Sequence, residues 1–138
     1  MRIRAIEEKS VAELLGVGAS GFGTSPIGQR LAEFADVPLR DLTEWQLAFL
    51  LRQRVAAVYL VPLAVERLKH DVWLDAGLYP GDLLLAVARN QGRLGSRKDL
   101  EDDIDALLVR AGASLGELDE IDRETALKAF GQADVKLK

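Results

Sequence analysis

The sequence contains no cysteine and a single histidine, His70, among its 138 residues. The lack of cysteine excludes a disulfide scaffold, a thiolate zinc site and a cysteine nucleophile. One imidazole cannot supply a site that needs two histidine ligands. His70 also falls late in an expected helix, where contact with the helix end or with water is favoured over catalysis. The sequence therefore predicts no catalytic residue, no metal site and no cofactor.

Long apolar runs are missing as well. The longest strongly apolar run without charge covers residues 55–65, which is 11 residues, and it contains Pro62. It is too short to span a bilayer. The first nine residues carry charge but no apolar core of the length of a signal peptide. We therefore expect a cytoplasmic protein that has no membrane partner.

Basic charge is scarce in one part of the chain. The net charge is −4, which does not favour direct binding to nucleic acid. Residues 99–124 hold ten acidic and two basic residues, a net charge of −8, whereas the rest of the chain carries +4. An electrostatic field of one sign steers a partner of the opposite charge. Two structural explanations are also open, because acidic residues at a helix start interact favourably with the helix dipole and charge runs often form a solvated face. The candidate binding residues are Asp99, Glu101, Asp102, Asp103, Asp105, Glu117, Asp119, Glu120, Asp122 and Glu124.

The composition is that of a globular protein, with 49% hydrophobic and 29% charged residues. The length favours one domain over two, and we find no internal repeat and no linker. Residues 2–6 are the only candidate for a short N-terminal strand. The sequence therefore predicts a single all-α domain over residues 1–138, built from five or six helices.

Helix signals recur along the chain. Capping boxes at residues 10–13 and 43–46 predict two helix starts, and the first helix must be short because glycines follow it. Ser25 is a plausible N-cap for a helix that has Pro26 in its first turn. Hydrophobic periodicity predicts the others. Not counting the short first helix, six helices are expected, one that starts near residue 43 and those over residues 26–35, 58–70, 83–89, 97–111 and 119–130.

Finer expectations concern helix ends and packed faces. We expect Ser96 to cap the helix at 97–111 and Gly112 to end it. Trp45 and Trp73 lie on apolar helix patterns and are expected in the core rather than at an interface. The inward faces are expected to hold Ile27, Leu31 and Phe34 in one helix and Ile121, Leu127 and Phe130 in the last.

A glycine pattern at residues 16–21, Gly-Val-Gly-Ala-Ser-Gly, matches the dinucleotide-binding fingerprint. That fingerprint functions after a strand and at the start of a helix, where backbone amides meet the pyrophosphate. Here a helix signal precedes the glycines, and Phe22, Gly23 and Pro26 follow them. A flexible loop is therefore favoured, and a small nucleotide-binding module that uses this loop is the alternative.

Two motifs resemble a known family. Residues 59–64, Tyr-Leu-Val-Pro-Leu-Ala, and residues 79–84, Tyr-Pro-Gly-Asp-Leu-Leu, are similar to the core of the immunity proteins of contact-dependent growth inhibition (CDI) systems. The Asp-Leu-Thr at 41–43 and the opening residues 2–14 also look like that family, so the resemblance covers about residues 1–89. These motif residues indicate a scaffold, because a Pro-Gly pair shapes a turn and the aspartate can cap the next helix. The motif residues that we single out are Tyr59, Pro62, Tyr79, Pro80, Gly81 and Asp82.

The resemblance implies a specific role. Such immunity proteins are cytosolic antidotes that bind the toxic C-terminal domain of an effector delivered by a sister cell. Many of these toxins are nucleases, and a nuclease needs a positive surface to hold phosphates. The acidic segment would then occupy that surface. An immunity protein against a toxin from another secretion system is a related alternative, whereas the residues by themselves indicate no more than an acidic helical interaction domain.

Overall fold

The computed structural model describes residues 5–138, except the side chains of residues 19 and 20. This part of the chain contains helices and no strand, which confirms the predicted all-α fold. Of the candidate strand at 2–6, residues 2–4 lie outside the described residues, and Ile6 begins a 3-10 helix. The α-helices are α1 (Val11–Leu15), α2 (Pro26–Ala35), α3 (Glu44–Arg52), α4 (Ala57–His70), α5 (Asp82–Ala88), α6 (Lys98–Ser114) and α7 (Glu120–Gln132). The 3-10 helices are η1 (Ile6–Glu8), η2 (Ala19–Phe22), η3 (Leu39–Asp41), η4 (Gln91–Arg93) and η5 (Leu115–Glu117).

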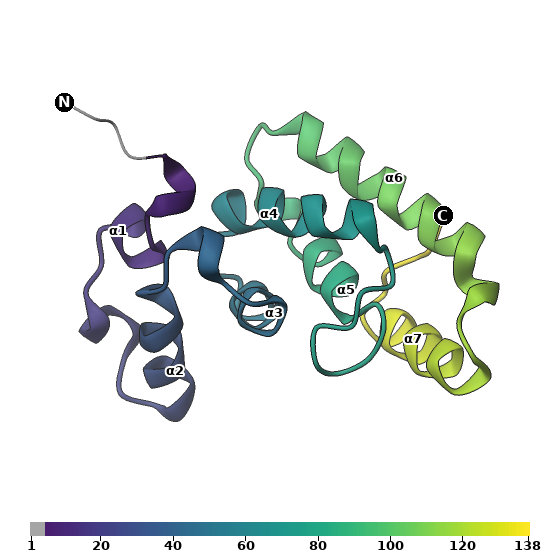
Figure 1. Ribbon diagram of the computed structural model, residues 1–138, viewed down its shortest axis with the longest axis horizontal. Coiled ribbons are helices and arrows are strands. Elements are labelled where there is room, and N and C mark those ends of the chain that lie inside the picture. Colours follow the sequence, from purple (N-terminus) through teal and green to yellow (C-terminus); the bar gives the residue numbers. More distant parts are fainter. Residues whose placement is uncertain (1–4) are drawn as a thin grey trace.

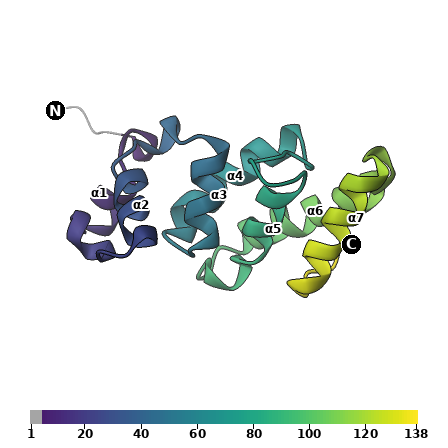
Figure 2. The ribbon, with the colours of Figure 1, turned by 90° about the horizontal axis from the view of Figure 1, so that it is seen from below.

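Helix α5 lies at the centre of the fold. All of its residues are buried, and it packs against α3, α4 and α6. Helices α1 and α2 lie at one end of the molecule and α7 at the other (Figures 1 and 2). One continuous cluster of buried apolar side chains extends from Val11 to Phe130 and connects these ends. No helix in the described part of the chain has the length and apolar composition needed to cross a bilayer.

The predicted helix starts are confirmed at the first three caps. Both capping boxes form with reciprocal hydrogen bonds between a cap side chain and a backbone amide. The Gln46 amide donates to Thr43 Oγ1 at 3.1 Å, and the Thr43 amide donates to Gln46 Oε1 at 3.0 Å. Ser25 Oγ accepts from the Gly28 amide at 3.0 Å and starts α2 at Pro26.

The ends of α6 differ from the prediction. Its N-cap is Arg97, which makes no side-chain cap, so Ser96 does not cap the helix. The helix also continues through Gly112 and ends at Ser114. Gly112 allows the C-terminal residue to pack closely, because a Cβ at this position would lie 3.3 Å from the backbone of Lys138. The Lys138 amide donates a hydrogen bond to the Leu108 carbonyl at 3.3 Å. The missing side chain leaves space for the chain to cross α6, which a sequence pattern does not reveal.

The inner face of α7 is rotated relative to the prediction. Phe130 is buried as expected, but Ile121 and Leu127 are 76% and 46% exposed. Ala126, one turn before Phe130, takes the second inner position. The Phe130 ring packs edge-on against Trp73 at 6.1 Å between centroids. This aromatic contact sets the rotation of α7, so its larger aliphatic side chains face outward.

The start of α2 shows a similar difference. Phe34 is buried and Leu31 half-buried as expected, but Ile27 is exposed. Gly28 is buried in its place, and a Cβ there would overlap the Phe22 carbonyl oxygen. The close approach of η2 to this glycine therefore determines which face of α2 turns inward.

Both tryptophans pack against the core, as expected. Trp73 is buried, and its Nε1 donates to Ser114 Oγ at 3.0 Å. Trp45 is half-buried, with its ring 5.5 Å from Phe34 and 5.6 Å from Phe49 between centroids. The two rings thus secure opposite ends of the helical core.

Candidate interaction surfaces

The ten candidate acidic residues occupy two places rather than one surface. Five lie in the first two turns of α6, and five lie between the end of η5 and the middle of α7. Asp105 is the eighth residue of the 17-residue helix α6, so the nine residues that follow it, about 14 Å of helix axis, separate the two groups (Figure 1). We define the α6 cluster as Asp99, Glu101, Asp102, Asp103 and Asp105, and the α7 cluster as Glu117, Asp119, Glu120, Asp122 and Glu124.

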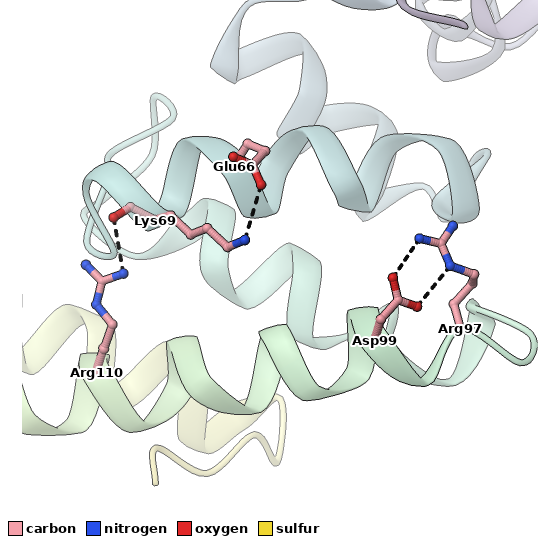
Figure 3. Close-up of polar contacts among 5 residues, drawn as sticks. All are labelled: Glu66, Lys69, Arg97, Asp99 and Arg110. Atoms are coloured by element: carbon pink, nitrogen blue, oxygen red, sulfur yellow. Dashed lines mark hydrogen bonds and ion pairs between the residues drawn. The ribbon is translucent and has the colours of Figure 1, made fainter.

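Part of the α6 cluster is neutralised by ion pairs. Arg97 holds Asp99 with two hydrogen bonds, Nε to Oδ1 at 3.0 Å and Nη2 to Oδ2 at 2.9 Å (Figure 3). The hydrogen bond from Arg97 lowers the pKa of Asp99. Two further pairs are Lys98 with Asp102 at 3.2 Å and Lys138 with Asp105 at 2.8 Å. These exposed pairs leave Glu101 and Asp103 as the members without an ion pair in the described chain.

The α7 cluster has no ion pair within residues 5–138. Asp119 caps the helix by accepting from the Asp122 amide at 2.8 Å. Partial desolvation raises the pKa of Asp122, and the negative charges of Asp119 and Asp75 raise it further. Asp75 belongs to the loop between α4 and α5, so this loop adds to the negative field. The α7 cluster therefore presents the less compensated charge of the two.

The turn motif at residues 79–82 forms the entrance to α5. Gly81 has φ 97°, and a Cβ there would meet the Trp73 ring at 2.7 Å. Asp82 does not cap the helix as predicted, because Gly81 takes the N-cap position. Its buried carboxylate instead accepts from the Ala76 amide at 2.7 Å and the Leu78 amide at 3.0 Å. Asp82 thus holds the preceding loop, and burial raises its pKa despite these hydrogen bonds.

The α4 motif lines a groove on the molecular surface. Pro62 is the sixth residue of α4 and lies in its second turn. The groove beside it has a volume of about 290 Å³. Glu7 and Arg97 contribute charged side chains to its lining. Its apolar walls consist of Ile6, Leu39, Val58, Tyr59, Pro62 and Leu63.

Sequence reasoning identified Tyr59 and Pro62 but not the groove. Its other walls come from η1, from η3 and from the residue before α6, which lie far apart in the sequence. Only the exposed apolar side chain of Ile6, close to an acidic pair, could have hinted at a second apolar surface.

The glycine pattern at residues 16–21 has no context for dinucleotide binding. Gly16 ends α1 in the left-handed conformation with φ 68°, and η2 follows three residues later. No strand precedes it in the described chain, and the next α-helix begins only at Pro26. These residues connect α1 and α2.

Comparison with known proteins supports the resemblance. A family model described as CDI immunity proteins matches residues 19–104. The match contains both motifs, extends past residue 89 into the α6 cluster and ends before α7, while the opening residues 2–14 lie outside it. No curated protein and no solved structure matches the chain.

Proposed function

The chain belongs to the family of CDI immunity proteins, and from this premise we propose that it binds and neutralises the C-terminal toxin domain of a contact-dependent growth inhibition effector. It acts as a single helical domain in the cytoplasm, as a non-enzymatic inhibitor that forms a complex with its target. The family match over residues 19–104 is the observation that carries this proposal.

The proposed toxin is a nuclease that meets an acidic surface of this chain. A nuclease holds the phosphates of its substrate with lysine and arginine side chains. Seven of the ten candidate acids have no ion pair in the described part of the chain, and five of these seven form the α7 cluster. Unpaired carboxylates can face the basic residues of a partner without first losing a partner of their own.

The two clusters act separately in solution. The screening length at physiological ionic strength is about 8 Å, which is shorter than the roughly 14 Å of α6 axis between the clusters. A toxin that contacts one cluster therefore gains little from the charge of the other. Charge reversal in each cluster in turn can show which of them faces the toxin.

The test is binding of the full chain to the C-terminal domain of the effector encoded beside it, by calorimetry and stopped-flow kinetics at low and high salt. We expect tight, salt-dependent binding and stoichiometric inhibition of the toxin's cleavage of nucleic acid. Two matched double variants reverse charge, Asp102→Lys with Asp103→Lys and Glu120→Lys with Glu124→Lys. Reversal in the contacting cluster slows association by about tenfold and weakens its salt dependence.

Two outcomes contradict separate parts of the proposal. If the folded toxin domain does not bind the wild-type chain, the antidote role is wrong. If it binds tightly but neither salt nor charge reversal changes the kinetics, the antidote role stands and the acidic surface is not part of the interface.

A further inference from the structure

We propose that the groove beside α4 receives an apolar side chain of the toxin domain that is flanked by a lysine or arginine. This inference rests on the proposed function, because it identifies the surface at which the toxin is held. It concerns a surface distinct from the α7 cluster.

Apolar surface in this groove is left open by the fold. Val58 and Ile6 are 37% and 54% exposed, whereas Leu39 beneath them is buried in the core. Tyr59 and Leu63 are half-buried and form the walls together with Pro62. Exposed apolar side chains that lie together and surround a hollow differ from single exposed ones, because a partner can bury them at once. A volume of about 290 Å³ accommodates one aromatic or long aliphatic side chain.

The groove also offers hydrogen-bonding groups. Pro62 has no amide hydrogen, so the Val58 carbonyl lacks the donor that residue i+4 supplies elsewhere in a helix. The Tyr59 hydroxyl has no hydrogen-bond partner within the described part of the chain. Both residues line the groove. A docked segment with a side-chain N–H group next to its apolar anchor can bind these oxygens.

The charges at the rim indicate which kind of side chain fits next to the anchor. Glu7 lines the groove and forms no ion pair within residues 5–138. Arg97 also lines it, but its guanidinium is held by both oxygens of Asp99 (Figure 3). Asp99 offsets the charge of Arg97, so Glu7 leaves the rim with a negative balance that suits a cationic side chain and repels an anionic one.

These features together fit one kind of occupant, an apolar side chain flanked by a lysine or arginine. The apolar hollow takes the anchor, and the acidic rim with the oxygens of Val58 and Tyr59 takes the flanking lysine or arginine. A basic segment with an apolar anchor is the chemistry expected at the surface of a nuclease.

The experiment replaces exposed groove residues by lysine and measures binding to the effector's C-terminal domain. Ile6→Lys and Val58→Lys remove apolar surface and add a charge that repels a basic segment. Val109→Lys is the matched control, because Val109 lies on α6 outside the groove and is 50% exposed. Circular dichroism and thermal unfolding check that each variant folds, and sedimentation of each chain alone detects self-association.

We expect each groove variant to weaken binding by at least about tenfold, mainly through faster dissociation, and the control to stay within about threefold of wild type. Groove variants that bind as tightly as the control overturn the groove and leave the antidote role intact. If Val109→Lys weakens toxin binding as much as the groove variants do, the groove proposal is also overturned, because the added charge alone then explains the weaker binding. If the wild-type chain forms a dimer and Val58→Lys dissociates it, the groove belongs to a second copy of the chain and the proposal is overturned. If the wild-type chain does not bind the toxin domain at all, the antidote role itself is wrong.

Discussion

Replacement of Asp82 by alanine removes the acceptor that holds the loop before α5. Its carboxylate is buried and accepts from the amides of Ala76 and Leu78. Ala76 is buried, so its amide loses a partner that water cannot easily replace, at a cost of about 1–3 kcal/mol. Leu78 is exposed, so water replaces the carboxylate there and the cost is about 0.5–1 kcal/mol. The variant recovers some desolvation of the charge, and we expect a net loss of about 2 kcal/mol in the free energy of unfolding.

The pH dependence of this loss follows from the pKa of Asp82. Burial raises its pKa above the ordinary value of 3.8, so the folded chain binds the proton more tightly than the unfolded chain. The contribution of Asp82 to stability is therefore greatest at low pH and declines as pH rises through the folded pKa. Alanine has no proton to bind, so Asp82→Ala costs more at about pH 3.5 than at about pH 7.

Urea unfolding followed by tryptophan fluorescence measures both quantities, because Trp73 packs against Gly81 at the end of this loop. Asp75→Asn is the control, since exposed Asp75 accepts from the nearby Gly77 amide at 2.7 Å and has no other side-chain hydrogen bond within residues 5–138. We expect that variant to stay within about 0.5 kcal/mol of wild type. A loss below about 0.5 kcal/mol for Asp82→Ala would refute the assigned role of the carboxylate. A loss that grows as pH rises would instead refute the raised pKa of Asp82.

Two further substitutions test how the ends of the molecule are held. Gly28→Ala places a Cβ against the Phe22 carbonyl oxygen and should lower stability by about 1–3 kcal/mol in thermal unfolding, whereas Gly131→Ala, which meets open space on α7, should not. Equal stability of the two variants contradicts the close packing of η2 on α2. Trp73→Phe removes the hydrogen bond to Ser114 and should cost about 1 kcal/mol in urea unfolding. If Trp73→Phe costs the same stability in a Ser114→Ala background as in wild type, the hydrogen bond between Trp73 and Ser114 is absent in solution.

The sequence predicts those parts of the fold that depend on local patterns. The capping boxes and the apolar stripe of α6 are local, and the buried positions Leu100, Ile104, Leu107, Leu108 and Ala111 follow that stripe. The rotation of α7 depends on the distant residue Trp73, and the burial of Gly28 depends on how the preceding 3-10 helix η2 folds back onto α2. Helical periodicity contains neither contact. The predicted capping role of Asp82 failed because the preceding loop folds so that its Ala76 and Leu78 amides reach the carboxylate.

The candidate site was also predictable from the sequence only in part. Charge composition located the acidic residues, but only the structure shows that α6 separates them and that Arg97, Lys98 and Lys138 neutralise some of them. The groove requires residues from three separate parts of the matched region and from before it, so no single motif encodes it.

The burial of α5 over its whole length constrains how this chain can diverge. A substitution within residues 82–88 changes packing against three other helices, and truncating a buried leucine there costs about 2–5 kcal/mol. Exposed positions of α6, α7 and the groove rim tolerate most replacements within about 0.5 kcal/mol. Surface changes can therefore accumulate and alter partner choice while the inner helix keeps the same architecture. A lineage of antidotes can in this way follow a changing toxin without having to find a new fold.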